Sequence, residues 1–85
     1  MKLSTSSRFD NDLKKILNKN PKYKSKLAKV LGLLQSNISD SSLKLHKLKG
    51  NNIYSVSLNY SIRILMRIEG DCIILVRIGT HDQVY

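Results

Sequence analysis

The chain has 85 residues, which is enough for one small domain, and we expect a single domain over residues 1–85. Fifteen Lys and Arg against six Asp and Glu give a net charge of +9. This excess indicates a polyanionic partner, either a nucleic acid or an acidic protein that shields the basic surface. The single cysteine excludes an internal disulfide, and with neither a secretory signal nor a long apolar run we expect a cytoplasmic protein without a membrane partner.

Two amphipathic helices are predicted in the N-terminal half, after a short edge strand at residues 2–6. The first begins with Ser7 as its cap and ends at the polar stretch 18–21. The second begins with Asn20 as its cap and Pro21 at its first helical position. The apolar residues at helical spacing are Phe9, Leu13, Ile16 and Leu17 in the first helix and Tyr23, Leu27, Val30, Leu31 and Leu34 in the second. These two stripes are expected to face the core.

The C-terminal half alternates apolar and polar residues, a pattern that is typical of β-strands. Its segments are an extended arm over residues 43–50, a strand over 53–60, two further strands over 62–68 and 72–78, and a short tail over 79–85. The predicted order is therefore β-α-α-β-β-β. This order favours a small α+β fold, in which an antiparallel sheet of three to four strands carries both helices on one face and leaves the other face open for a ligand.

The last two strands are predicted to form a hairpin whose register places two arginines side by side. A three-residue loop at 69–71 pairs Ile68 with Cys72 and sets Arg63 directly opposite Arg77. A two-residue turn would move Arg77 to the apolar face, so the sequence argues against it. Because adjacent like charges repel, this pair predicts an anion such as a phosphodiester on the open face.

The residue types favour acid–base chemistry over metal chemistry. Two histidines, no paired carboxylates and a lone cysteine give no metal-ligand cluster, and no glycine-rich phosphate loop is present, so we expect no cofactor. What remains is His46, His81, Tyr85 and the lysines beside the arginine pair. RNA suits such a site because it carries its own nucleophile, the 2′-hydroxyl. Cleavage then needs a base, a cation for the phosphorane and an acid for the 5′-oxygen.

Four segments together resemble the RelE/ParE toxin superfamily over nearly the whole chain. They are FxxxLKK at residues 9–15, LHKLKG at 45–50, RILMRI at 63–68 and IGTHDQVY at 78–85. The resemblance implies a RelE-like fold and a toxin of a type II toxin–antitoxin module, neutralised by an acidic antitoxin. The RelE-like branch cleaves mRNA in the ribosomal A site without a metal, whereas the ParE-like branch inhibits DNA gyrase. We therefore expect a RelE/YafQ-like endoribonuclease, an mRNA interferase, with a ParE-like gyrase inhibitor and a plain nucleic-acid-binding domain as the alternatives.

The resemblance also implies roles for individual residues. It places His81 at a family histidine that serves as general acid or base, and Arg63 at the strand arginine that stabilises the transition state. Tyr85 falls at an aromatic residue that stacks on a base or assists proton transfer, and His46 matches a histidine of the YafQ-like subgroup. These four residues are the predicted catalytic set.

One departure from that subgroup concerns the region of the strand turn. The subgroup has a further His and an Asp there, where this chain has only Ser57, Asn59 and Ser61. The predicted acid–base set is therefore incomplete against that pattern, and either His46 or a lysine completes it or the activity is weak. The basic residues expected to bind RNA phosphates are Lys44, Lys47, Lys49, Arg67 and Arg77.

Overall fold

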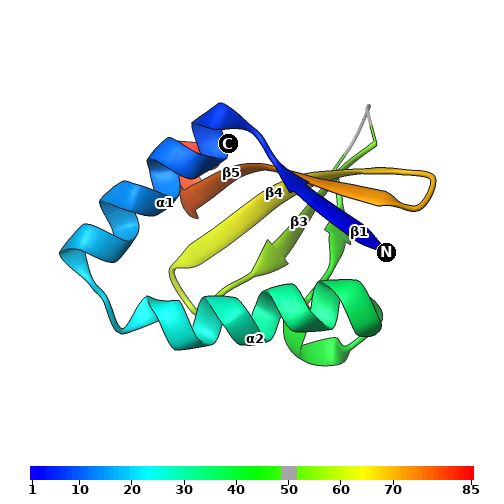
Figure 1. The fold of residues 1–85 in the computed structure, drawn as a ribbon, viewed down its shortest axis with the longest axis horizontal. Helices are drawn as coiled ribbons and strands as arrows, with labels where there is room; N and C mark the ends of the chain where they lie inside the picture. Colours follow the sequence, from blue (N-terminus) through cyan, green and yellow to red (C-terminus); the bar gives the residue numbers. More distant parts are fainter. Residues whose placement is uncertain (49–51) are drawn as a thin grey trace.

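The computed structural model describes residues 1–48 and 52–85, which form an α+β fold (Figure 1). The elements are β1 (Lys2–Thr5), α1 (Ser7–Lys19), α2 (Tyr23–Ser36), the 3₁₀ helix η1 (Ser41–Leu43), β2 (His46–Lys47), β3 (Ile53–Ser57), β4 (Ile62–Glu69), β5 (Cys72–Thr80) and α3 (His81–Val84). None of the helices within the described ranges is long and apolar enough to cross a membrane. The predicted fold class is confirmed.

The described residues form a five-stranded sheet in the order β1-β5-β4-β3-β2. Neighbouring strands are antiparallel except at one edge, where β1 runs parallel to β5. The predicted sheet of three to four antiparallel strands is therefore wrong in strand number and in one pairing. The parallel pair arises because α1 and α2 carry the chain to the far edge of the sheet, so that β5 can return beside β1 in the same direction. The extra strand is β2, part of the arm predicted over residues 43–50.

Ser6, and not the predicted Ser7, caps α1. Its Oγ accepts a hydrogen bond from the Phe9 N–H at 3.0 Å and donates one to the Val76 carbonyl oxygen at 2.8 Å. The Ser6 N–H also donates to the Leu75 carbonyl oxygen at 2.9 Å. The first turn of α1 is thus tied to β5 at the point where β1 stops pairing with it.

The second helix begins later than predicted. The Tyr23 N–H donates to the Asn20 carbonyl oxygen at 3.1 Å, so Asn20 and Pro21 form a turn that precedes α2. The helix cap is Lys22, which makes no side-chain capping bond. The apolar stripe of α2 nevertheless faces the sheet as expected, because its spacing does not depend on where the helix starts.

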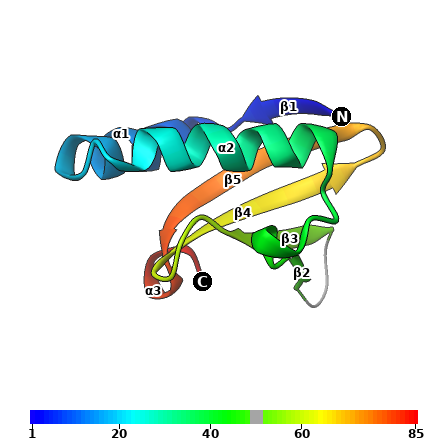
Figure 2. The ribbon, with the colours of Figure 1, turned by 90° about the horizontal axis from the view of Figure 1, so that it is seen from below.

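The core lies between the two long helices and one face of the sheet. Figure 2 shows α1 and α2 together on one side of the strands, and α3 on the other side at the end of β5. The buried core residues are Phe9, Leu27, Val30 and Leu34 from the helices, Leu43 from η1, and Val56, Leu58, Ile62, Ile64, Met66, Ile73, Leu75 and Ile78 from the β3–β5 region. Leu65 and Val84 are also buried but lie outside this core cluster.

The β4–β5 hairpin turns over two residues, Gly70 and Asp71, with Glu69 paired to Cys72. Gly70 has a φ of 57°, which suits glycine at the first central position of a two-residue hairpin turn. The predicted three-residue loop, and with it the pairing of Ile68 to Cys72, is therefore wrong.

A β-bulge at Val76 keeps Arg77 out of the core despite the two-residue turn. Met66 pairs with Leu75, but the adjacent residue on β4, Leu65, pairs with Arg77, so Val76 has no partner on β4. The extra residue shifts the alternation of side chains by one position. Apolar residues before and after the bulge consequently face the helices, and Arg77 faces away from them.

The register places Arg63 opposite Gly79 and Arg77 opposite Leu65. The prediction that the two arginines lie directly opposite each other is therefore wrong, although they are diagonal neighbours on one face. This face, on the side of the sheet away from the core, is called the open face. It carries His46, Ser55, Ser57, Arg63, Leu65, Arg67, Arg77 and Gly79.

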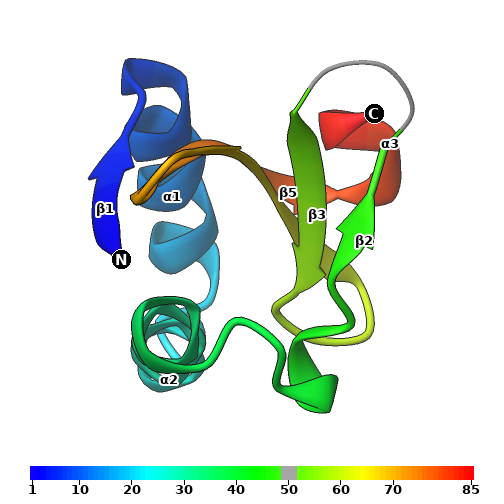
Figure 3. The same cartoon turned by 90° about the vertical axis from the view of Figure 1, so that its right-hand side faces the viewer.

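The last residues fold back as α3 instead of leaving the hairpin as the predicted tail. A capping box closes the helix start, with the Thr80 N–H donating to Gln83 Oε1 at 2.9 Å. Glycine at position 79 lets α3 approach this closely, since a Cβ there would lie 3.2 Å from Gln83 Cβ and 3.3 Å from Val84 Cγ1 and would force α3 to shift. Helix α3 therefore packs on the open face, on the side of the sheet away from α1 and α2 (Figure 3).

Candidate active site

Arg63 on the inner strand β4 is held by a hydroxyl from β3. Its Nε and Nη2 donate to Ser55 Oγ at 2.8 and 2.7 Å. Ser55 is completely buried, whereas Arg63 is only partly buried. Among the described residues, no carboxylate lies within ion-pair distance of Arg63. The guanidinium is thus fixed by a neutral partner and keeps its whole positive charge for a ligand.

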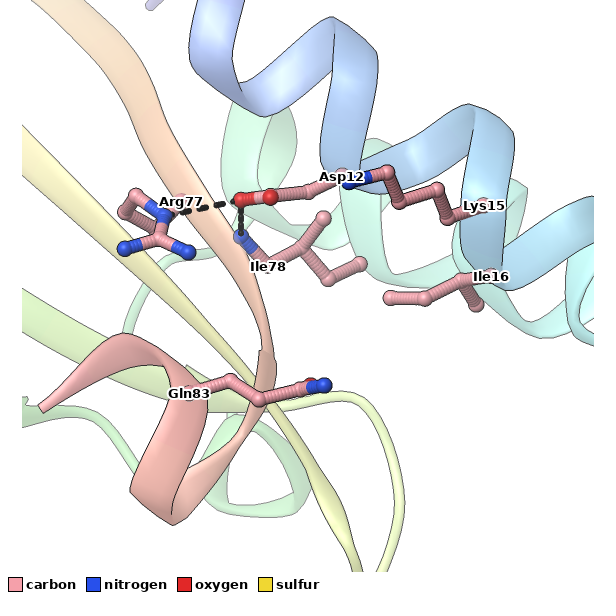
Figure 4. A pocket seen from close by; sticks show the side chains of 6 residues that line it. All are labelled: Asp12, Lys15, Ile16, Arg77, Ile78 and Gln83. Carbon is pink, nitrogen blue, oxygen red and sulfur yellow. Dashed lines mark hydrogen bonds and ion pairs between the residues drawn. The ribbon is translucent and has the colours of Figure 1, made fainter.

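Arg77 on β5 is held by a carboxylate from α1. Its Nε donates to Asp12 Oδ2 at 2.9 Å, and the Ile78 N–H donates to the same oxygen at 3.2 Å (Figure 4). Burial raises the pKa of Asp12, but the hydrogen bonds from Arg77 and Ile78 and the charge of Arg77 outweigh it, so the pKa lies below its ordinary value. Arg77 therefore ties α1 to β5, and its charge is neutralised.

The Asp12–Arg77 pair borders a groove between α1 and α3. One pocket of about 220 Å³ is lined by Asp12, Lys15, Ile16, Arg77, Ile78 and Gln83 (Figure 4). A second pocket of about 420 Å³ shares Lys15, Ile16 and Gln83 and extends to Lys19, Asn20, Tyr23, Ile62 and Thr80. None of the four predicted catalytic residues lines either pocket. The two pockets, called the α1–α3 groove, are therefore distinct from the surroundings of Arg63.

His46 lies on the open face, beside the hydroxyl that holds Arg63. It is exposed on β2 and pairs with Ser55. The next residue, Lys47, pairs with Tyr54 on the opposite face, where its Nζ lies 5.8 Å from the centroid of the Tyr54 ring. The sheet thus brings His46 towards Arg63 and turns Lys47 away from it.

His81 and Tyr85 face each other at the C-terminus. Their ring centroids are 4.3 Å apart at an interplanar angle of 51°, and both side chains are exposed. His81 Nδ1 also lies 3.6 Å from Asp82 Oδ1. Because Gln83 and Val84 of α3 pack against Gly79, the pairing partner of Arg63, the helix that carries both rings lies at the Arg63 end of the open face.

The remaining predicted RNA-binding residues differ in their surroundings. Arg67 is half-exposed and forms an ion pair with Glu69 at 2.7 Å. Lys44 is exposed and ends η1 in the left-handed conformation, with a φ of 49°. Lys49 lies outside the described residues. Of the five predicted RNA-binding residues, only Arg67 and Arg77 have carboxylate partners among the described residues.

Sequence reasoning missed Ser55 and Gly79, which support the predicted residues without being among them. The alternation in β3 places Ser55 on the polar side of the strand, but a single serine there does not indicate which arginine it binds. Gly79 directly precedes the cap of α3. The need for a residue without a side chain at this position follows only from the helix that packs on it. Both residues depend on contacts that the local pattern does not contain.

The groups available for chemistry on the open face are protonatable side chains and guanidinium groups. Within residues 1–48 and 52–85, no three His, Cys, Asp or Glu side chains come together as a metal-ligand group. Imidazole and phenol groups can transfer protons near neutral and alkaline pH, and a fixed guanidinium can stabilise a developing negative charge. The arrangement is suited to acid–base chemistry on an anionic substrate.

Comparison with solved structures identifies the fold as that of bacterial toxins. A metal-bound toxin from Helicobacter pylori is 31% identical, with a TM-score of 0.83 and coverage of 100% of this chain and 99% of that chain. YafQ from Escherichia coli strain BL21(DE3) is 20% identical, with a TM-score of 0.82 and coverage of 98% and 96%. YafQ in the E. coli DinJ–YafQ toxin–antitoxin complex is 20% identical, with a TM-score of 0.83 and coverage of 98% and 94%.

A protein-family comparison extends this likeness to the sequence. No curated protein matches the chain. The family described as the bacterial toxin of a type II toxin–antitoxin system, YafQ, matches residues 1–85, which is the whole chain. The predicted RelE/YafQ-like resemblance is confirmed, and the chain belongs to the YafQ family of type II toxin–antitoxin toxins.

Proposed function

We propose that this toxin is a metal-independent endoribonuclease that cleaves mRNA on the ribosome, in the cytoplasm. The single observation that supports it best is Arg63, a charged guanidinium fixed by a buried hydroxyl on an open face that also carries His46. Helix α3 adds His81 and Tyr85 at the same end of this face. A binding domain without chemistry has no need for imidazoles beside such an arginine.

The reaction uses the 2′-hydroxyl of the RNA as the nucleophile. One imidazole removes the proton from this hydroxyl as its oxygen attacks the adjacent phosphorus, and a second proton donor protonates the departing 5′-oxygen. His46 and His81 supply these two functions. Arg63 stabilises the extra negative charge on the phosphorane, and Tyr85 stacks on a base or assists the proton transfer.

Phosphates away from the scissile bond are bound by basic residues around the open face. Lys44 and Arg67 are exposed and suited to this purpose. Lys47 projects from the opposite face of β2, so we propose that it contacts RNA at the edge of the sheet. Replacing one of these cations should weaken RNA binding irrespective of sequence and reduce its salt dependence.

An antitoxin is the proposed protein partner, by analogy with the E. coli DinJ–YafQ toxin–antitoxin complex, and the positive charge of this chain favours an acidic one. The α1–α3 groove has the chemistry to bind it, because Ile16, Tyr23 and Ile62 give apolar contacts and Lys15 and Lys19 supply positive charge. The double variant Lys15→Glu, Lys19→Glu should therefore weaken binding of the small acidic protein encoded beside the toxin gene, as measured by calorimetry. An unchanged affinity would exclude this groove.

The proposed activity is tested by adding the purified toxin to translating ribosomes and mapping mRNA ends by toeprinting. We expect new 5′ ends with the wild type and none with Arg63→Ala or His81→Ala. Lys24→Ala, which removes an exposed charge on α2, is the matched control and should still cleave. Intact mRNA together with gyrase-dependent DNA breaks would overturn the proposal in favour of the ParE-like alternative.

A further inference from the structure

We propose that Ser55 is a positioning residue, which orients Arg63 so that the outer edge of its guanidinium, Nη1 and Nη2, receives the phosphate. The inference rests on the proposed function of Arg63 and adds the residue that makes this function possible. Ser55 does not touch the substrate, since it is completely buried. It acts through the two hydrogen bonds that it accepts.

Among the described residues, hydrogen bonds occupy only one edge of the Arg63 guanidinium. An arginine side chain has five N–H donors, arranged as two forks. Ser55 Oγ accepts from Nε at 2.8 Å and from Nη2 at 2.7 Å, so the Nε–Nη2 fork is occupied. The Nη1–Nη2 fork remains, and this planar pair of donors matches two oxygens of one phosphate.

The neighbouring serine on β3 shows that this contact is specific. By register, Ser57 lies directly opposite Arg63 and on the same face as Ser55. Its hydroxyl, however, donates to the Asn59 carbonyl oxygen at 2.7 Å. Arg63 therefore leans diagonally towards Ser55, which is the residue beside His46. The contact directs the guanidinium along the sheet to the side where an imidazole is present.

A hydroxyl suits this task better than a carboxylate. Ser55 fixes the direction of the guanidinium without cancelling its charge, whereas Asp12 neutralises Arg77. Lysine could not replace Arg63, because an ammonium group lacks the second fork and cannot hold the serine and a phosphate in fixed geometry.

The test compares Ser55→Ala, Ser55→Thr and the matched control Ser57→Ala in the full chain. The first readout is the cleavage rate constant and KM with ribosome-bound mRNA. The second is the NMR signal of the Arg63 Nε–H and its exchange with solvent, recorded with and without a 2′-O-methyl RNA oligonucleotide that cannot be cleaved. If Ser55→Ala does not fold, Ser55→Cys replaces it, since a thiol has similar volume but is a weak acceptor.

Removal of the hydroxyl should lower the cleavage rate constant by roughly 10- to 100-fold with little change in KM, because the guanidinium loses its fixed direction. The Arg63 Nε–H should exchange faster in the same variant. Ser55→Thr keeps the hydroxyl and should restore both readouts, and Ser57→Ala should alter neither. A merely structural serine would change stability but would not move the Arg63 signal selectively.

A wild-type rate and an unchanged Arg63 Nε–H signal in Ser55→Ala would overturn the inference. Failure of the proposed function is a different result, namely a wild type that cleaves no RNA. In that case the NMR signal of the Arg63 Nε–H still tests whether Ser55 positions Arg63. Slow exchange that is lost in Ser55→Ala supports the positioning, and equal exchange in both proteins excludes it.

Discussion

Arg63 and Arg77 come from neighbouring strands and lie diagonally on the same face of the sheet, yet they are bound in different ways. A buried hydroxyl holds Arg63, and a carboxylate holds Arg77. Both guanidinium groups are fixed, but within residues 1–48 and 52–85 a carboxylate compensates the charge of Arg77 and none compensates that of Arg63. We propose that this difference in the charge of the partner, and not the position in a strand, suits Arg63 to bind an anionic substrate and Arg77 to tie α1 to β5.

The difference arises from where each strand lies in the sheet. β4 is an inner strand, so Arg63 finds its partner on β3. β5 extends beyond the end of β1, and there its edge bonds to Ser6, the cap of α1, and to Asp12 of α1 in place of a strand. Arg77 follows the bulge in this segment and therefore meets the carboxylate of α1.

Replacing Arg63 tests the proposed difference between the two arginines most directly. We expect Arg63→Ala to lower the rate of mRNA cleavage by about 100- to 1000-fold, as does the loss of one charge-stabilising donor in other active sites. Its free energy of unfolding should fall by no more than about 1–3 kcal/mol, because the buried Ser55 hydroxyl loses its partner, and the protein should still fold. Primer extension and urea unfolding measure the two effects. An active Arg63→Ala protein would remove this residue from the mechanism.

Displacing α3 from the Arg63 end of the open face should have the next largest effect. In Gly79→Ala, the new Cβ would lie 2.7 Å from Gln83 Oε1, which is the atom that caps the helix. Since His81 and Tyr85 are then moved, we expect roughly 10- to 100-fold slower cleavage. Gly32→Ala is the control, because nothing lies within 4 Å of a Cβ there. Equal activity of both variants would show that the position of α3 does not matter.

Asp12→Asn should instead affect stability. The Asp12 and Arg77 side chains are only 15% and 21% exposed, so losing the charge leaves Arg77 without an anionic partner. We expect a loss of about 1–3 kcal/mol in the free energy of unfolding. Activity per folded molecule should remain close to that of the wild type. Asp10→Asn, an exposed acid on the same helix, should lose much less.

A cleavage defect in Asp12→Asn without a loss of stability would contradict this distinction. Arg77 would then behave as a site residue, as the sequence alone suggested. Urea unfolding and toeprinting on the same preparations separate the two outcomes.

Much of the fold was accessible from the sequence because it depends on local patterns. The apolar stripes around Leu27 and Leu34, and the alternation along β3 and β4, correctly predicted which faces enter the core. The position of Arg63 on the open face followed from the same alternation. The residue types singled out His46 and His81, and the family resemblance added their roles, which remain predictions.

The parts that were mispredicted depend on contacts between distant segments. The bulge at Val76 is stabilised by Ser6, whose hydroxyl donates to the Val76 carbonyl oxygen, and no pattern within β5 indicates this. The short helix α3 contains one turn, which is too little for a helical periodicity to be visible. The partners of the two arginines, Ser55 and Asp12, are likewise set by tertiary packing.

The smallest expected effect is a difference in how stability depends on pH. Of the two partners of the arginines, only the Asp12 carboxyl titrates. Both arginines stay charged, and the serine hydroxyl does not ionise. The pKa of Asp12 in the folded protein is lowered, so its contribution to stability is present above the unfolded-state pKa of about 3.9 and is lost as the pH falls through the folded-state value.

Urea unfolding between pH 7 and pH 2 should therefore show a gap between wild type and Asp12→Asn that closes in acid. Hydrogen bonds from Ser42 also lower the pKa of Asp40, but this group is present in both proteins and cancels in the difference. The gap between wild type and Ser55→Ala should not follow the same curve, because Ser55 has no proton to gain. If the Asp12→Asn gap stayed constant to pH 2, the carboxylate charge would not be what holds Arg77, and the proposed difference between the two arginines would be lost.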